Sequence, residues 1–157
     1  MSKSTRATAA LGAAGVKFDV IAYAYDPDAD RIGMQAAESL GVSPSIVLKT
    51  LMAEVDGKPV CVVLPSDREV SMKKLAAAFK GKSANMMKPA VAEKATGYVV
   101  GGISPFGQKK AVPTVFEIEA MAHDLVYVNG GQRGLQVKLA PADAVAAAKA
   151  ITAAIVA

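Results

Sequence analysis

Two apolar segments separated by an Asp-Gly pair constrain the fold of this chain more strongly than any other feature. Residues 47–53 and 59–64 are rich in β-branched and aliphatic side chains, and Asp56-Gly57 lies between them. This pattern is typical of a β-hairpin, because a two-residue turn needs positive φ angles that Asp and Gly tolerate. Since a hairpin makes its strands antiparallel, we predict a mixed sheet with both segments as central strands, rather than an all-parallel sheet.

Helices and further strands are predicted along the rest of the chain from hydrophobic periodicity and from proline and glycine at helix ends. The predicted helices cover residues 3–14, 33–40, 71–79, 88–95 and 141–154. The other predicted strands cover residues 16–25, 98–100, 112–118, 125–128 and 135–139. A chain of 157 residues is long enough for one domain with a buried core and too short for two. We therefore predict a single α/β (α+β) domain, residues 1–157, with about six to seven strands and surrounding helices.

The single cysteine and the single histidine argue against several classes of chemistry. One cysteine allows no internal disulfide, and together they allow neither a His-rich nor a Cys-rich zinc site. Cys61 lies within an apolar strand segment, where a small buried side chain is a more common role than a nucleophile. His123 has no Gly-Xaa-Ser-Xaa-Gly elbow elsewhere in the chain to act with. The sequence therefore disfavours a Ser-His-Asp or Cys-His hydrolase, and we predict no metal and no cofactor.

The charge of the chain gives modest support for a polyanionic partner, since the formal net charge is +4. Many of the lysines concentrate in the middle of the chain, at Lys73, Lys74, Lys80, Lys82, Lys88, Lys94, Lys109 and Lys110. They are compatible with solvated helix faces and with contacts to nucleic-acid phosphates, and both interpretations stay open. No stretch approaches the roughly 20 consecutive apolar residues of a membrane span, so we predict a soluble cytoplasmic protein without a membrane partner.

A glycine-rich segment, residues 96–108, is the candidate binding loop. The pair Gly101-Gly102 follows a β-prone run and allows another backbone or a ligand to approach closely. Ser104-Pro105 then restricts the direction in which the chain leaves the loop. On its own, the segment is as compatible with a structural turn as with a binding loop. Lys49 likewise interrupts an apolar strand, either as a lysine that reaches water at the sheet margin or as a functional cation.

Four segments in this order carry a family resemblance. They are Val47-Leu-Lys-Thr-Leu51, Ser71-Met-Lys-Lys-Leu75, Thr96-Gly-Tyr-Val-Val-Gly-Gly-Ile-Ser-Pro-Phe-Gly-Gln-Lys-Lys110 and Val128-Asn-Gly-Gly-Gln-Arg-Gly-Leu135. Together they resemble the YbaK/EbsC-type Cys-tRNA(Pro) deacylases, relatives of the editing domain inserted in bacterial prolyl-tRNA synthetases. The resemblance runs from about residue 16 to the C-terminal helix. It implies a compact α/β editing domain around a mixed, barrel-like sheet.

The resemblance also implies which residues form the site. Lys49 matches the family's functional lysine, and Gly101 and Gly102 match its catalytic loop. The implied substrate-binding residues are Tyr23, Thr50, Ile103, Ser104, Pro105, Phe106, Gly130, Gly131 and Arg133. Some relatives carry an acidic residue just after the Arg-Gly-Leu segment, whereas this chain has Gln136 at that position.

The implied activity is trans-editing, the deacylation of tRNA(Pro) mischarged with cysteine, with Cys-tRNA(Cys) as a second candidate substrate. The substrate's own thiol would attack the ester carbonyl, and N–H groups at residues 101–104 would stabilise the oxyanion, so no protein nucleophile is needed. The implied partners are the 3′ acceptor end of aminoacyl-tRNA and prolyl-tRNA synthetase, with the chain as a monomer or a weak dimer. Two alternatives stay open: a deacylase for Ala- or Ser-tRNA that uses water, and a non-catalytic tRNA- or synthetase-binding module.

Overall fold

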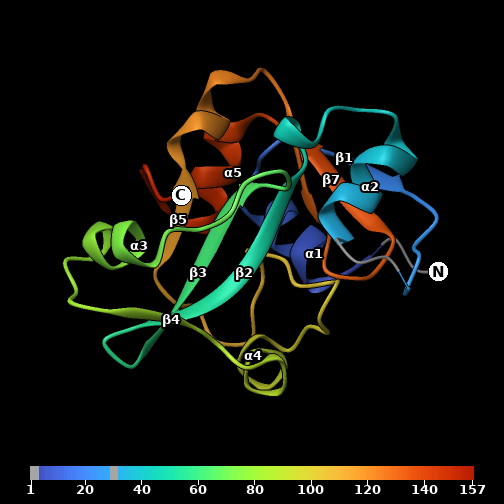
Figure 1. The fold of residues 1–157 in the computed structure, drawn as a ribbon. Helices are drawn as coiled ribbons and strands as arrows, with labels where there is room; N and C mark the ends of the chain where they lie inside the picture. The colour runs from blue at the N-terminus through green and yellow to red at the C-terminus, as the bar shows by residue number, and fades with distance from the viewer. Residues whose placement is uncertain (1–3, 29–31) are drawn as a thin grey trace.

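The computed structural model describes residues 4–28 and 32–157, which form two β-sheets with helices around them (Figure 1). The helices are α1 (Arg6–Ala13), α2 (Ile32–Leu40), α3 (Met72–Ala78), α4 (Pro89–Thr96) and α5 (Pro141–Ala148), with short 3-10 helices η1 (Pro44–Ile46) and η2 (Ile118–Ala122). The strands are β1 (Asp19–Ala22), β2 (Leu48–Val55), β3 (Lys58–Pro65), β4 (Ala84–Met86), β5 (Thr114–Glu117), β6 (Val126–Asn129), β7 (Leu135–Leu139) and β8 (Ile151–Ala153). Within the described ranges, none of the helices has the length and apolar character that a membrane crossing requires.

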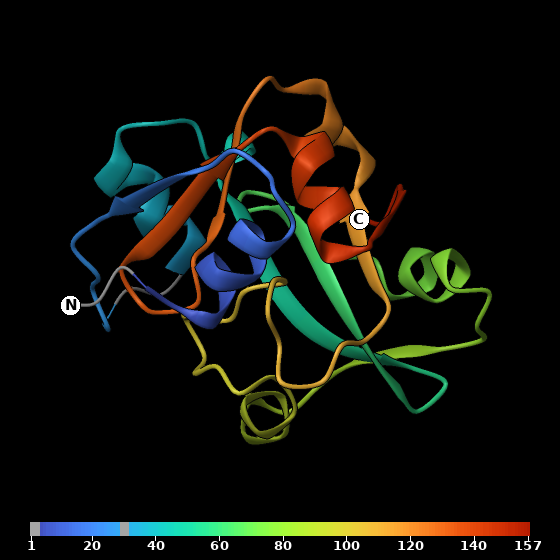
Figure 2. The same ribbon diagram turned by 180° about the vertical axis from the view of Figure 1, so that it is seen from behind.

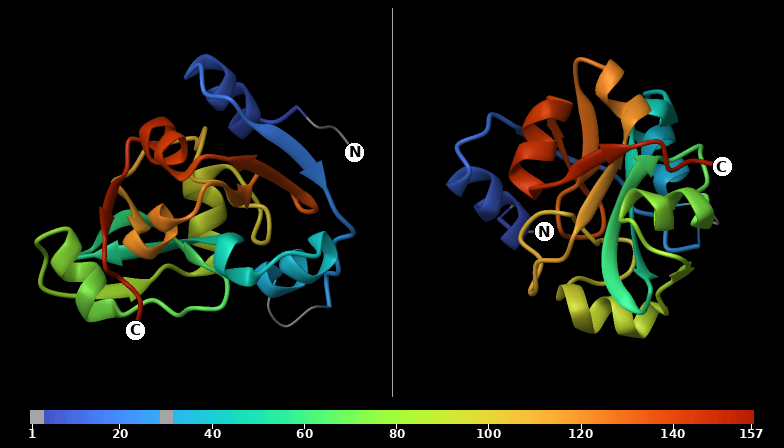
Figure 3. Two further views of the ribbon diagram at one scale, coloured as in Figure 1. Left: turned by 90° about the horizontal axis from the view of Figure 1, so that it is seen from above. Right: turned by 90° about the vertical axis from the view of Figure 1, so that its left-hand side faces the viewer.

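The predicted mixed sheet is confirmed, and it is divided into two. The larger sheet has the strand order β4-β2-β3-β5-β8, with β2 and β3 as the predicted antiparallel hairpin and with parallel β3–β5 and β5–β8 pairs. The smaller sheet has the order β1-β7-β6 and is antiparallel. A parallel bridge between Val47 and Tyr127 joins the sheets at the start of β2, and the views in Figure 3 show them at an angle to each other. The arrangement resembles a barrel that stays open.

One edge of β2 is only partly paired. Residues 53–55 pair with β4, and Val47 forms the bridge to β6, but residues 49–51 between them have no strand partner on this edge within the described chain. We call residues 49–51 the open edge. Met87 N–H donates to the Met52 carbonyl at 3.1 Å, so the main-chain groups of Met52 point to this side. Because these groups alternate along a strand, the N–H and C=O of Thr50 also point toward the open edge.

The core lies on both faces of the larger sheet, as the two-residue period of its central strands requires. Leu48 and Met52 of β2 pack in the larger apolar cluster, to which α1, α4 and α5 contribute; α1 and α5 are seen together in Figure 2. Ala53 and Val55 pack in a second cluster with α3. A third, smaller cluster places α2 against Val47, next to the joint between the sheets.

Two predictions about local structure are wrong. Residues 98–100 form a turn instead of a strand, because α4 ends at Gly97 in the left-handed conformation and Gly102 N–H then donates to the Val99 carbonyl at 2.8 Å. The last helix stops at Ala148 rather than near residue 154, and β8 follows. Pairing of β8 with β5 overrides the helix propensity of this alanine-rich segment.

Candidate active site

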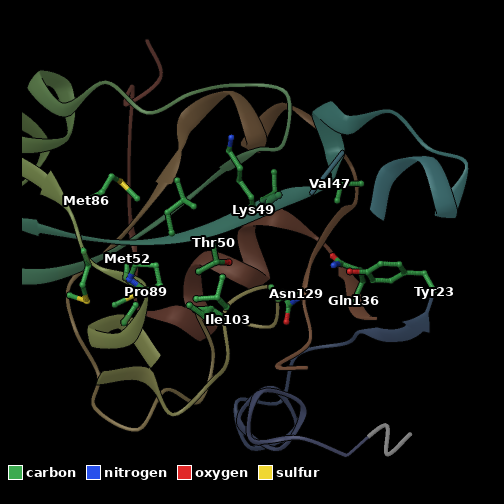
Figure 4. Close-up of a pocket in the computed structure, with 16 residues that line it drawn as sticks. Tyr23, Val47, Lys49, Thr50, Met52, Met86, Pro89, Ile103, Asn129 and Gln136 are labelled. Atoms are coloured by element: carbon green, nitrogen blue, oxygen red, sulfur yellow. The ribbon is translucent and has the colours of Figure 1, made fainter. Parts of the chain in front are cut away.

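The open edge borders a cavity of about 300 Å³. Its wall is assembled from both sheets: β2 forms one side, β4 and α4 form the second, the loop of residues 100–103 forms the third, and β6, β7 and Tyr23 just after β1 close the fourth. Figure 4 shows Lys49 and Thr50 pointing to opposite sides of β2, with Tyr23 and Gln136 at one end and Met52 and Met86 at the other. The cavity therefore wraps around the part of β2 that lacks a strand partner.

The structure brings together five of the residues predicted for the site, from distant parts of the sequence. Tyr23, Lys49, Thr50, Gly101 and Ile103 line the cavity. The other predicted residues do not line it: Gly102, Ser104, Pro105, Phe106, Gly130, Gly131 and Arg133. Lining residues that the sequence analysis did not select include Asn129, Gln136, Met52, Met86, Met87 and Pro89.

Lys49 is the one charged residue among the described residues that line the cavity. Its side chain is 20% exposed, and its Nζ lies 3.7 Å from Oε1 of Glu69, whose side chain is 72% exposed. An ion pair with so exposed a carboxylate is weak, because water screens it. The one cation among the described lining residues therefore stays partly open to solvent, where an anionic or carbonyl oxygen of a ligand would find a positive charge.

The glycine loop is braced from behind by β6 and the segment that follows it. Asn129 Nδ2 donates to the Gly101 carbonyl at 3.1 Å, and Arg133 Nε donates to the Val100 carbonyl at 2.9 Å. A Cβ atom on Gly102 would lie 2.9 Å from the main-chain nitrogen of Arg133, so only glycine fits this approach. The loop is thus fixed in shape, and Arg133 supports it instead of lining the cavity.

Hydrogen bonds within the glycine loop leave only some of its main-chain N–H groups available to a ligand. Gly102 N–H is already donated to the Val99 carbonyl. The N–H groups of Gly101 and Ile103 have no partner in the part of the chain that the structure describes. Gly101 has a φ of 89°, which glycine tolerates far better than other residues.

Neither Ser104 nor Cys61 is available as a nucleophile in the cavity. Ser104 is fully buried, its Oγ accepts a hydrogen bond from Phe106 N–H at 3.2 Å, and its carbonyl accepts one from Gln108 Nε2 at 3.0 Å. Phe106 itself is part of the core. Burial raises the pKa of Cys61 to about 12, so its thiol stays protonated near neutral pH, as the sequence predicted for a buried cysteine.

Three polar atoms of lining residues are buried without a hydrogen-bond partner in the described structure: Tyr23 OH, Thr50 Oγ1 and Gln136 Oε1. Burial raises the pKa of Tyr23, so its hydroxyl keeps its proton near neutral pH. A buried polar group without a partner costs about 1–3 kcal/mol of folding free energy, so three in one cavity point to a ligand or water that satisfies them.

The opposite wall is apolar, formed largely by Met52, Met86, Met87, Pro89 and Ala92. The described residues contain no group of three or more His, Cys, Asp or Glu side chains that could hold a metal ion. The arrangement offers a lysine, main-chain N–H donors and hydroxyl groups around a small apolar space. Such a cavity can bind and polarise a carbonyl compound whose side chain is small or apolar.

Comparison with known families shows which proteins this chain is similar to. The family model described as the aminoacyl-tRNA editing domain matches residues 26–147 of this chain. EbsC of Enterococcus faecalis, whose name gives deacylation of Cys-tRNA(Pro) and Cys-tRNA(Cys) as its proposed activity, is 42% identical over 107 residues. This alignment covers 67% of the present chain and 65% of EbsC, so the chain spans slightly less than two thirds of that relative.

Other proteins are similar to this chain at lower identity. The proline–tRNA ligase of Acidithiobacillus ferrooxidans is 30% identical over 109 residues, which are 63% of this chain and 19% of the ligase. A solved structure described as a proposed trans-editing enzyme for prolyl-tRNA synthetase superposes with a TM-score of 0.84 at 18% identity, covering 100% of this chain and 98% of the other. At this identity the superposition shows a common fold.

Proposed function

This chain belongs to the aminoacyl-tRNA editing domain family, and we propose that it is a trans-editing deacylase that acts on Cys-tRNA(Pro). One observation carries the proposal: Lys49, the open edge and the braced glycine loop line one cavity, and the described residues that line it include no serine, cysteine or histidine. The likeness to EbsC supports cysteine as the amino acid and tRNA(Pro) or tRNA(Cys) as the carrier. Prolyl-tRNA synthetase is the proposed protein partner.

The proposed mechanism takes its nucleophile from the substrate. The cysteinyl sulfur attacks its own ester carbonyl carbon, a C–S bond forms, and the C–O bond to the terminal ribose breaks. The thiol proton is transferred to the departing ribose oxygen, and cysteine leaves as a cyclic thioester that water later opens. Intramolecular reactions of this kind reach effective molarities of about 10⁵–10⁸ M when the reacting groups are held in the right orientation.

The residues around the cavity would hold and polarise the ester. We assign oxyanion stabilisation to the N–H groups of Gly101 and Ile103, each such donor being worth about 2.7–4 kcal/mol in other enzymes. Lys49 would polarise the carbonyl or anchor the terminal adenosine, while Tyr23 and Thr50 would position the acyl group. Gly102 would act by keeping the loop close to residues 132–133. Ser104, Pro105, Phe106, Gly130, Gly131 and Arg133 would support the loop from outside the cavity.

A deacylation panel tests the proposal directly. Cys-, Ala-, Ser- and Pro-tRNA(Pro) are incubated with the purified protein, with and without prolyl-tRNA synthetase, and ester loss and products are followed by mass spectrometry. We expect rapid loss of the cysteinyl ester with a thiolactone intermediate. Comparable hydrolysis of Cys- and Ala-tRNA would contradict the thiol mechanism.

A water-dependent deacylase for alanine or serine is the second candidate, because the methionine wall of the cavity suits a small apolar side chain. It would release a free amino acid without a thiolactone. A non-catalytic binding module would instead show salt-sensitive binding of aminoacyl-tRNA while the ester decays at its uncatalysed rate.

A further inference from the structure

Gln136 is a buried amide in the cavity wall that the thiol mechanism does not use. It lies in β7, the middle strand of the smaller sheet, opposite Ile21 of β1 and Asn129 of β6. The residue is 4% exposed and lines the cavity, where Figure 4 shows it beside Tyr23. Its Oε1 has no hydrogen-bond partner in the described part of the chain. An amide oxygen only accepts hydrogen bonds, and the neighbouring Tyr23 hydroxyl, with which the Gln136 side chain interacts, does not satisfy it in this structure, so a donor on a bound molecule can.

Asn129 on the neighbouring strand provides a matched comparison. It is also buried, at 8% exposed, and it lines the same cavity. Its Nδ2 donates to the Gly101 carbonyl at 3.1 Å, and its Oδ1 accepts from Gly131 N–H at 2.7 Å. Of two amides that face each other across β6 and β7, Asn129 therefore holds the glycine loop, whereas Gln136 keeps an acceptor oxygen available.

The other groups that line the cavity restrict which ligand group could donate to Gln136 Oε1. The described lining residues include no carboxylate, and their one charged group is the ammonium of Lys49. Tyr23 and Thr50 carry hydroxyls, which both donate and accept, so Gln136 Oε1 is the unpartnered atom that is limited to accepting. An aminoacyl ester carries one strong donor close to its carbonyl carbon, namely the α-amino group two bonds away. Lys49, the glycine loop and Gln136 line one cavity, so an ester bound there would have its α-amino group in the same space as the Gln136 amide.

We propose that Gln136 is a specificity-determining residue that accepts a hydrogen bond from the α-amino group of the bound aminoacyl ester. The inference rests on the proposed function and specifies its substrate class: α-amino acyl groups are selected over plain acyl groups of the same size. A neutral amide oxygen accepts from an amine and from an ammonium alike. Recognition therefore does not need a buried carboxylate, whose desolvation would be costly.

Two pairs of non-hydrolysable ligands test this inference. In the first pair, 3′-amino-3′-deoxyadenosine is acylated through an amide bond with cysteine or with 3-mercaptopropionic acid; in the second, with alanine or with propionic acid. Within each pair, the ligands differ only in the α-amino group. By calorimetry, we expect the wild type to bind the amino ligand of at least one pair about ten- to a hundredfold more tightly, the range for a hydrogen bond to a charged group.

Variants of Gln136 show whether this residue causes the preference for ligands with an α-amino group. Gln136→Met keeps the length of the side chain and removes the acceptor, so the affinity ratio within the pair should fall close to one. Gln136→Glu keeps an acceptor oxygen and should retain the preference. Asn129→Leu is the matched control: loss of its loop contact should weaken both ligands to a similar degree and leave the ratio unchanged.

Thermal unfolding separates recognition from a structural role. Gln136→Met removes an unsatisfied acceptor, so its Tm should equal or exceed that of the wild type, whereas Asn129→Leu should lower it. An unchanged ratio in Gln136→Met, or a wild type that binds the members of both pairs equally or not at all, would overturn the inference. Ester loss from Cys-tRNA(Pro) is measured in parallel. Deacylation without a Gln136-dependent ratio overturns this inference alone, and the ratio without deacylation overturns the proposed function alone.

Discussion

The two halves of β2 share one partner strand and differ in what lies at their other edge. Residues 53–55 pair with β3 on one side and β4 on the other, and Ala53 and Val55 are packed in the core. Residues 49–51, the open edge, pair with β3 alone and border the cavity. In β2, pairing at the strand edge, more than local sequence, therefore decides which part of a continuous strand is available to a ligand.

Lys49→Ala changes the open edge and is the substitution with the largest expected effect on activity. Removing the ammonium that we propose to act on the ester carbonyl should lower kcat/KM for Cys-tRNA(Pro) by about 10²–10³-fold, the range for losing one electrostatic contact to a developing oxyanion. The unfolding midpoint should change little, because the Glu69 carboxylate that pairs with Lys49 is largely exposed and water screens the pair. Lys58→Ala, an exposed lysine at the start of β3, is the matched control and should keep full activity. Equal deacylation rates in Lys49→Ala and Lys58→Ala would show that the lysine of the open edge has no special role.

Ala53→Leu tests the paired half. Ala53 is fully buried between β3 and β4, so the added methylenes have no space and should lower the free energy of unfolding by about 1–3 kcal/mol. Urea denaturation measures this change. The activity per folded molecule should stay near that of the wild type, and a large loss of kcat in the folded variant would show that the two halves do not act separately.

Ser104→Ala should have a smaller effect, and, like Ala53→Leu, it should lower stability more than activity. The hydroxyl accepts a hydrogen bond from Phe106 N–H inside the core, so its loss should cost about 0.5–1.5 kcal/mol of stability. Most deacylase activity should remain, because Ser104 lies outside the cavity wall. Complete inactivation together with an acyl-enzyme in mass spectra would make Ser104 a nucleophile and refute the substrate-thiol mechanism.

The smallest expected effect near neutral pH is that of the Cys61 thiol on stability, which appears only at alkaline pH. Cys61 pairs with Met52 where the two halves meet, and burial raises the pKa of its thiol from 9.0 to about 12. The folded state therefore keeps a proton that the unfolded state loses above about pH 9, so stability falls as the pH rises from 9 toward 12. Subtracting the unfolding free energies of Cys61→Ala from those of the wild type isolates this slope. A difference that is independent of pH over this range would contradict the buried thiol.

The sequence predicted the elements whose signals are local. Asp56-Gly57 predicted the hairpin, and Pro89 with Gly97 marks the ends of α4 as proline and glycine usually do. β4 and β8 were missed because each has three residues and is defined by its partner strand. Residues 98–100 were predicted as a strand because their β propensity is high, although the turn at Gly97 prevents pairing.

For the site, the sequence identified the lysine and the glycine loop but not the residues opposite them. Asn129 and Gln136 belong to the smaller sheet, which the bridge between Val47 and Tyr127 and the packing of the shared core bring beside β2. Asn129 in an Asn-Gly-Gly segment is typical of a turn, and nothing local shows that its side chain reaches back to Gly101. Contacts of this kind depend on the angle between two sheets, which no short segment encodes.

The open edge also has a consequence for self-association. An unpaired strand edge is a template on which another chain can add a strand, and this is a common route to aggregation. Here the stretch without a strand partner is limited to residues 49–51, it carries a charged lysine, and β4 and β6 flank it on either side. A lysine on an edge strand disfavours the addition of a strand from a second copy of the chain. The lysine proposed for catalysis is thus also a safeguard that keeps the unpaired edge of β2 from joining neighbouring molecules.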